Sequence, residues 1–178
     1  SLSSEITLQP IQRFDLDAAI IFSDILMLPY GLGQKVEFIK NFGPKLGELN
    51  LNDINKINET DFMQKIEPVY KAIKKVSSDP ILNNKNTIGF VGAPWTLLVY
   101  MINQQSPKKD LKKNFFKDES FINKILLIIE KFLKIHIKNQ IDNGANVIQI
   151  FDSWAGLLEE KYLSNYIYAP TLNLVNYV

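Results

Sequence analysis

The 178-residue chain contains no cysteine, a single histidine, His136, and a single arginine, Arg13. The absence of cysteine excludes disulfides, thiolate zinc sites and a cysteine nucleophile, and it fits a reducing compartment, so the cytoplasm is the expected location. His136 lies inside an apolar helical stretch without a second histidine to complete a zinc site, which predicts a structural role. The most apolar stretches, residues 17–28 and 122–137, are too short or too interrupted by charge to cross a bilayer, and we expect no membrane insertion.

An excess of charge of either sign is also missing. The 20 Lys plus Arg residues nearly balance the 19 Asp plus Glu residues, for a formal net charge of +1. Without a large basic patch, neither nucleic acid nor an anionic membrane surface is an expected partner. The length suits one domain but is short for an eight-fold (β/α) barrel, which needs about 250 residues.

Short apolar runs alternate with segments of helical periodicity along the chain. The runs at 18–23, 87–91 and 147–151 predict strands, and the first, continuously apolar from 18 to 22, is typical of a parallel strand covered on both faces. A long loop with a short strand at 35–39 is expected over 29–51, and a surface loop over 103–114. Helices are predicted at the opening segment with a kink near Pro10, at 61–76, 94–102 and 118–142, and over 157–177 with a break around Pro170.

Strands that alternate with helices indicate the α/β class and a parallel sheet with right-handed crossovers. No repeat, low-complexity tract or linker divides the chain, so residues 1–178 are expected to form a single domain or part of one.

Polar residues directly follow each predicted strand, where reactive groups gather in parallel α/β folds. Asp24 follows the first, a Gly-Ala-Pro-Trp-Thr segment at 92–96 follows the second, and Asp152 and Ser153 follow the third. Asp24 is flanked by apolar residues, so its carboxylate would be partly desolvated and suited to a cation or a cluster of N–H groups. Alternatively, Asp24 only caps a helix that starts at Ile25.

Three longer motifs carry a family resemblance. They are TLQP at 7–10 with LDAAIIFSDIL at 16–26, IGFVGAPWTL at 88–97 followed by Tyr100 and Met101, and GA at 144–145 with QIFDSWAG at 149–156. In this order the motifs resemble the uroporphyrinogen decarboxylase family. The resemblance implies a TIM-type (β/α)8 barrel, only part of which is present in this chain, and in the complete enzyme a homodimer.

The resemblance also implies an activity. Members of the family are carboxy-lyases of haem biosynthesis that convert the tetrapyrrole uroporphyrinogen III to coproporphyrinogen III by removing its four acetate carboxyls, without a metal or an organic cofactor. By resemblance, Asp24 is the catalytic aspartate and accepts hydrogen bonds from the pyrrole N–H groups. Tyr100 and Ser153 would bind near Asp24 or to substrate carboxylates, and Phe90 would line the apolar floor.

Structural explanations stand beside these roles. Taken without the resemblance, Tyr100 is an ordinary helix residue and Ser153 a helix cap. Trp95 and Trp154 are expected to pack beside strand ends, Asp152 to cap a helix, and the lysine pairs at 108–109 and 112–113 to lie on a solvated face.

Two family features are not found among these residues: an Arg-Gln-Ala-Gly-Arg-type motif and a histidine near the carboxyl terminus. In addition, Gln12 stands where the family often has an arginine before Arg13, and Asn-Gln-Gln at 103–105 replaces an acidic, glycine-rich turn. Guanidinium groups that bind carboxylates are not readily replaced by lysine, so the 178 residues alone are expected to form an incomplete, inactive site.

Two alternatives remain open. A corrinoid-linked methyltransferase shares the barrel but needs a His and Cys zinc set that is absent here. A non-catalytic barrel fragment or porphyrinogen-binding module is the second, and its unpaired strand edges would favour self-association.

Overall fold

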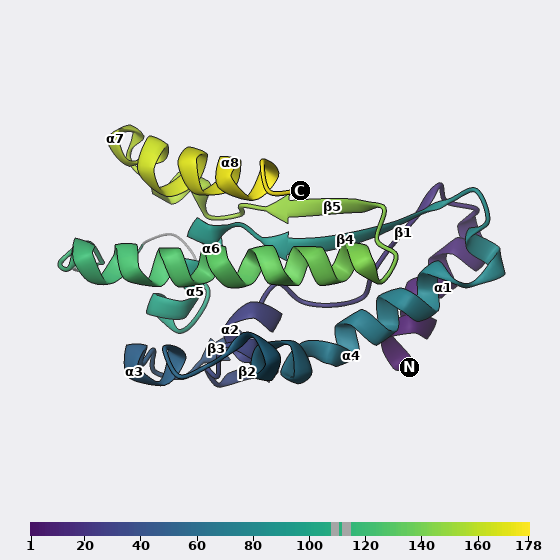
Figure 1. Cartoon of the computed structure of the whole chain (residues 1–178), viewed down its shortest axis with the longest axis horizontal. Helices are drawn as coiled ribbons and strands as arrows, with labels where there is room; N and C mark the ends of the chain where they lie inside the picture. Colours follow the sequence, from purple (N-terminus) through teal and green to yellow (C-terminus); the bar gives the residue numbers. More distant parts are fainter. Residues whose placement is uncertain (108–110, 112–114) are drawn as a thin grey trace.

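A computed structural model describes residues 1–107, 111 and 115–178. Its central feature is a three-stranded parallel sheet in the order β1 (Ala18–Ile20), β4 (Asn86–Gly92), β5 (Val147–Phe151). Figure 1 shows the long helix α6 (Glu119–Asp142) alongside β4 and β5, and α4 (Glu59–Ser77) toward α1 (Leu2–Phe14). The α/β class and the parallel pairing are therefore confirmed, and the arrangement is part of a barrel.

The predicted helices are found close to their expected bounds, because local capping defines them. Asn58 and Asp118 accept hydrogen bonds from backbone N–H groups in the first turns of α4 and α6. Pro94 opens α5 (Pro94–Asn103), where its missing N–H costs nothing. Gly144 follows α6 with a φ of 109°, in the left-handed region that ends many helices.

The strand predicted at 18–23 is shorter than expected and is covered on one face only. Ala19 and Ile21 are buried, whereas Ile20 and Phe22 are 57% and 56% exposed. The helices α1 and α4 cover the buried face, and no described residues form a second layer over Ile20 and Phe22. The expectation of a strand buried on both faces is therefore wrong for this chain.

The stretch 29–51 is not one long loop. It holds the end of α2 (Met27–Gly31) and an antiparallel hairpin of β2 (Val36–Ile39) and β3 (Gly43–Leu46), and it leads into α3 (Leu51–Ile54). The short strand predicted at 35–39 is confirmed as β2, whereas β3 was not predicted. Most of the hairpin is exposed, so its sequence lacks the apolar alternation that reveals a half-buried strand. It is fastened to the segment after α5, because the N–H of Leu46 donates to the carbonyl of Gln104.

After β5 the chain forms short helical segments. They are η2 (Ala155–Leu157), α7 (Glu160–Leu163), a π-helical turn η3 (Ser164–Tyr168) and α8 (Ala169–Val175). The predicted break around Pro170 is displaced: the irregular turn precedes the proline, which occupies the first turn of α8, where a proline is tolerated. The remaining short element is η1 (Pro80–Leu82), between α4 and β4.

The main core lies between the sheet and helices α4, α5 and α6. Trp95 is fully buried and contacts the rings of Phe115, Phe116 and Tyr166, which confirms its predicted packing role. Among the described residues, no helix is both long and apolar enough to span a membrane. The lysine pairs at 108–109 and 112–113 lie outside the described residues.

Candidate functional site

The carboxyl ends of the three parallel strands surround one cavity of about 360 Å³, here called the central hollow. Asp24, Phe90, Tyr100 and Ser153 all line it, so the structure brings together every site residue predicted from the sequence. Five parts of the chain form the wall: the segment after β1, the end of β4, the helix α5, the end of β5 and the hairpin. The other lining residues are Ser23, Ile25, Leu26, Phe38, Pro44 and Phe151.

Asp24 is half-buried, and its Oδ1 atom accepts a hydrogen bond of 2.7 Å from the backbone N–H of Leu26. The carboxylate makes no other hydrogen bond within the described part of the chain. Burial raises the pKa of Asp24, and the bond from Leu26 only partly offsets this. Asp24 therefore holds the turn that precedes α2, and this helix begins at Met27, not at Ile25 as the capping alternative predicted; the side chain also lines the hollow.

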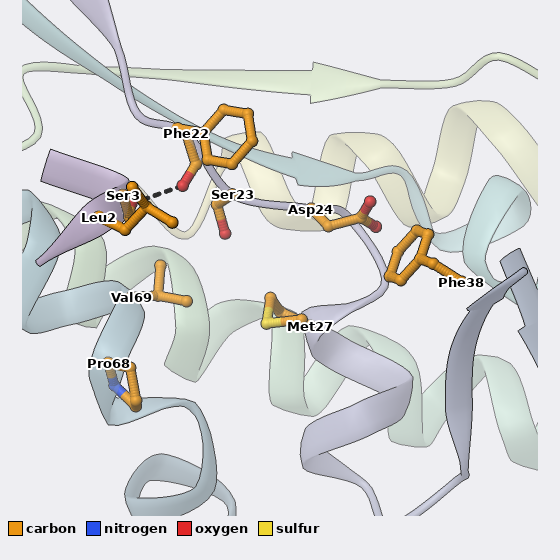
Figure 2. Close-up of a pocket in the computed structure, with 9 residues that line it drawn as sticks. All are labelled: Leu2, Ser3, Phe22, Ser23, Asp24, Met27, Phe38, Pro68 and Val69. Atoms are coloured by element: carbon orange, nitrogen blue, oxygen red, sulfur yellow. Dashed lines mark hydrogen bonds between the residues drawn. The ribbon is translucent and has the colours of Figure 1, made fainter. Parts of the chain in front are cut away.

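Figure 2 shows Asp24 in a second cavity of about 420 Å³ that adjoins the central hollow. The two cavities share Ser23, Asp24 and Phe38. The carboxylate points toward the side on which the Phe38 ring lies, and Met27 and Val69 line the opposite side (Figure 2). Asp24 is thus the one acid within a largely apolar surface.

Tyr100 reaches the hollow from α5 and is half-buried. Burial raises the pKa of its hydroxyl, and the negative charge of Asp24 raises it further, so the phenol stays protonated at neutral pH. Neither Tyr100 nor Ser153 hydrogen-bonds to Asp24 in the described residues, although both line the same cavity. The two hydroxyls therefore do not hold the carboxylate of Asp24, and the hydroxyl of Tyr100 interacts with Trp154 and Ser106 instead.

The apolar part of the wall is formed by aromatic rings from adjacent strands. Phe90 and Phe151 meet edge to face with ring centroids 5.5 Å apart. Phe90 was predicted, whereas Phe151, Phe38 and Pro44 were missed. Phe151 belongs to the third motif and precedes Asp152, so its position at the strand end was the available signal. Phe38 lies in the strand predicted at 35–39, but nothing in the sequence placed that strand beside the hollow, and Pro44 lies in β3, which was not predicted.

Comparison with known proteins concerns the family to which the chain belongs. The sequence model of the family "Uroporphyrinogen decarboxylase (URO-D)" matches residues 1–178. The uroporphyrinogen decarboxylases of Orientia tsutsugamushi (strain Ikeda) and Rickettsia bellii (strain RML369-C) are 44% and 40% identical over 97% of this chain. That of Agrobacterium fabrum (strain C58 / ATCC 33970) is 36% identical over 98% of the chain.

The chain belongs to the uroporphyrinogen decarboxylase family.

The chain spans about half the length of these uroporphyrinogen decarboxylases, with 51% of each covered. A methyltransferase from Methanosarcina mazei has the same fold, with a TM-score of 0.80 over 99% of this chain and 53% of that structure. At 20% sequence identity the likeness concerns the fold alone. Both comparisons agree with a partial barrel.

A buried polar network holds two walls of the central hollow together. The Thr96 hydroxyl donates to Asp152 Oδ1 at 2.7 Å and accepts a bond of 3.1 Å from the N–H of Trp154. The indole N–H of Trp95 donates to the carbonyl of Trp154 at 2.9 Å. These contacts tie the first turn of α5 to the segment that carries Ser153.

The Asp152 side chain interacts with both the hydroxyl and the backbone N–H of Thr96, so it caps the first turn of α5 and not a helix of its own segment. Burial raises the pKa of this carboxyl, and the Thr96 hydroxyl lowers it in part. Trp154 packs against Tyr100, with ring centroids 6.0 Å apart, in agreement with its predicted packing role. His136 lies outside the hollow and is buried beside Tyr70 and Gln140.

Proposed function

We propose that this chain supplies the aspartate-bearing part of an active site that decarboxylates uroporphyrinogen III to coproporphyrinogen III in haem biosynthesis. The observation that carries the proposal is the convergence of Asp24, Tyr100, Ser153 and Phe90 on one hollow in a chain of this family. The same proposal makes residues 1–178 one partial barrel unit of a cytoplasmic homodimer that needs no metal or organic cofactor.

The chemistry requires a site that stabilises a positive charge. Protonation of a pyrrole carbon gives a cationic ring, and this ring accepts the electron pair released when the bond between the acetate methylene and its carboxyl breaks. Carbon dioxide leaves, a proton adds to the methylene carbon to form a methyl group, and the ring loses its extra proton. The protein's main task is therefore to hold the cation and orient the scissile bond.

Asp24 is suited to this task. Its carboxylate is a fixed negative charge in a partly desolvated position, where it attracts a cation more strongly than it would in water. Its one protein hydrogen bond uses Oδ1, which leaves acceptor capacity for pyrrole N–H groups. Phe90 and Phe151 offer apolar surfaces for the tetrapyrrole, and the hydroxyls of Tyr100 and Ser153 offer hydrogen bonds at the rim.

The eight substrate carboxylates need cationic partners, and this chain supplies few near the hollow. Its one arginine, Arg13, is exposed near the end of α1 and does not line the hollow. We therefore propose that the arginine motif implied by the family belongs to the complete protein and completes the site. The 178 residues alone should be inactive.

A porphyrinogen-binding module without catalysis is the second candidate. The hollow and Asp24 would serve it equally well, because acceptance of pyrrole N–H bonds needs no proton transfer. Turnover separates the two candidates: a binding module retains porphyrinogen but never forms coproporphyrinogen.

The decisive experiment compares the full-length protein, its Asp24→Asn variant and the isolated 178-residue chain, with coproporphyrin measured after oxidation. We expect activity in the full-length protein, a loss of about 10²–10³-fold in kcat for Asp24→Asn, and no activity in the isolated chain. Asp53→Asn, at an exposed surface ion pair with Lys56, is the matched control and should retain full activity. An active Asp24→Asn variant would remove Asp24 from the mechanism.

A further inference from the structure

The hydrogen-bond ladder between β1 and β4 stops just before the central hollow. Its last register pair is Ile20 with Ile88, and its last bond runs from the N–H of Ile21 to the carbonyl of Ile88 at 3.0 Å. An extension of the register by two residues would pair Phe22 with Phe90. In such a parallel ladder the backbone groups of Phe90 would bond to the two residues that flank Phe22.

Gln140 takes the place of that missing strand partner. Its side-chain amide donates to the carbonyl of Phe90 at 3.0 Å and accepts from the N–H of Phe90 at 3.0 Å. Gln140 projects from α6 and is only 1% exposed. A single buried amide thus satisfies both backbone groups of a residue that lines the hollow, and no strand is needed there.

The Gln140 amide is itself held in one orientation. Its Nε2 atom lies 3.2 Å from His136 Nε2, and His136 Nδ1 lies 3.0 Å from the Tyr70 hydroxyl. Because the amide nitrogen can only donate, His136 accepts at Nε2 and carries its hydrogen on Nδ1, which donates to the Tyr70 oxygen. Burial lowers the pKa of His136 to about 4, so this neutral ring persists at neutral pH.

Side chains of α1 bind the chain just after β1, on the side that faces away from β4. The N–H of Phe22 donates to Thr7 Oγ1 at 2.8 Å, and the Ser3 hydroxyl donates to the carbonyl of Phe22 at 2.6 Å (Figure 2). Asp24 follows two residues later. Beyond Ile21, β1 and β4 are no longer paired. A side chain of α6 holds β4 at Phe90, and side chains of α1 hold the end of β1 that leads to Asp24.

Gly89, which precedes Phe90 on β4, leaves room for the Gln140 amide only because it has no side chain. A Cβ atom added to Gly89 would overlap the Gln140 Oε1 atom and would lie 3.2 Å from the Cβ of Ala145. Any side chain at position 89 would therefore push the amide away from Phe90.

We propose that Gln140 is a positioning residue of the site: its amide replaces strand pairing at Phe90, keeps β1 and β4 apart beyond Ile21, and so sets the placement of Asp24 relative to Phe90. The inference rests on the proposed function for its catalytic consequence, but its structural part stands independently. Loss of the amide leaves two backbone groups of Phe90 without partners, and either they gain water or the ladder extends by one pair and draws Ser23 and Asp24 toward β4.

Three variants of the full-length protein test this. Gln140→Met removes both bonds and keeps a flexible side chain of similar volume. Gly89→Ala keeps Gln140 but displaces its amide, and it serves as the second variant if the first folds poorly. The matched control is Asn146→Ala, because Asn146 Oδ1 accepts the N–H of Thr87 at 2.9 Å on the same strand, at the end remote from the hollow.

Amide hydrogen exchange gives the structural readout. In Gln140→Met and Gly89→Ala we expect faster exchange at Phe90, or else slower exchange at Ser23 if the ladder extends, with neither change in Asn146→Ala. Kinetics with uroporphyrinogen III give the catalytic readout: kcat should fall about tenfold or more in the two site variants, with KM less affected, because misplacement of Asp24 weakens transition-state stabilisation. The control should stay within about twofold of the unaltered protein.

The inference is overturned if hydrogen exchange at Phe90 and Ser23 is unchanged in the two site variants and if they lose only stability, as Asn146→Ala does. Gln140 would then be an ordinary buried residue. Altered exchange with unaltered kcat would overturn its positioning role. If the unaltered protein shows no decarboxylation at all, the proposed function fails, whereas the exchange data still decide whether Gln140 holds the strands apart.

Discussion

At the scale of single residues, Asp24 shows a conflict between stability and function. Its carboxylate is held in a half-buried, largely apolar place with one hydrogen bond from the protein, although a fully solvated carboxylate would be more stable. Residues kept under such conditions are candidates for function, because the desolvated charge is what a cationic transition state requires.

The raised pKa of Asp24 gives a prediction for stability. A folded-state pKa above that of the unfolded chain means that ionised Asp24 destabilises the fold at neutral pH, and this destabilisation disappears as the pH falls through the raised value. Asp24→Asn keeps an acceptor for the Leu26 N–H and should raise the free energy of unfolding at pH 7 by roughly 0.5–1 kcal/mol. Urea denaturation measures this, and a gain that does not shrink toward acidic pH would contradict it.

His136 gives the opposite pH dependence. Its folded-state pKa of about 4 lies below the ordinary value of 6.5, so the unfolded chain binds the proton first. Its contribution to stability is complete above pH 6.5 and is lost as the pH falls from 6.5 toward 4, by up to about 1.4 kcal/mol per pH unit. Unfolding free energies across this range should show that slope in the unaltered protein and a smaller one in His136→Gln, which can still hydrogen-bond; equal slopes would refute the prediction.

The sequence predicted the residues that lie in motifs after strands, and the structure gathers them in one hollow. Asp24 and Ser153 could be placed because they follow strands, and the carboxyl ends of parallel strands meet at one edge of the sheet. Tyr100, on α5, was named only through the family resemblance. Gln140 and the Thr96–Asp152 bond could not be predicted. They join residues about 50 positions apart through side-chain hydrogen bonds, which leave no periodic pattern.

At the scale of elements, the helices were predictable because their caps and apolar stripes are local. Of the hairpin, β2 was predicted as the short strand at 35–39, whereas β3 was missed, because the hairpin lies outside the parallel sheet and exposes most of its residues. The length of β1 was overestimated for a related reason: the apolar run continues to Phe22, but the ladder ends where Thr7 and Gln140 bind the backbone in its place.

Two glycines with positive φ, one in open space and one in a crowded place, allow the cost of backbone strain to be measured apart from the cost of crowding. Gly144 ends α6 with a φ of 109°, and an added Cβ would lie 2.6 Å from the Cβ of Ser77; Gly43 has a φ of 93° and open space around it. We expect Gly43→Ala to cost about 1 kcal/mol of unfolding free energy from strain alone. Gly144→Ala should cost more, about 2–4 kcal/mol, because α4 and α6 must also move apart. Thermal or urea denaturation measures both; equal losses would show that Ser77 yields without cost.

At the scale of the whole molecule, residues 1–107, 111 and 115–178 form an open parallel sheet whose edge strands, β1 and β5, pair on one side only. Apolar side chains are exposed near both edges; they include Ile20, Phe22, Val147 and Phe151. The described residues cover one face of the sheet with helices and leave the other face without a second layer. In a closed barrel this second face would form the lining.

This openness predicts self-association of the isolated 178-residue chain, since exposed edges and apolar patches favour intermolecular pairing. Sedimentation velocity should show species larger than the monomer that increase with concentration. Ile20→Lys, on the open face of β1, should reduce them, whereas Leu127→Lys, at a residue of α6 that is 68% exposed, should not. A monomeric isolated chain would show that its edges are protected.

The attachment of β1 to α1 also bears on how the chain is made. Synthesis proceeds at about 5–20 residues per second, so β1 leaves the ribosome roughly 3–13 seconds before β4, its partner in the sheet. During this interval the hydroxyls of Ser3 and Thr7 are already available to bond the backbone of Phe22. The segment that holds α1 and β1 can therefore occupy the backbone groups of Phe22 before β4 is made, and this limits pairing of that edge with a neighbouring chain on the same messenger RNA.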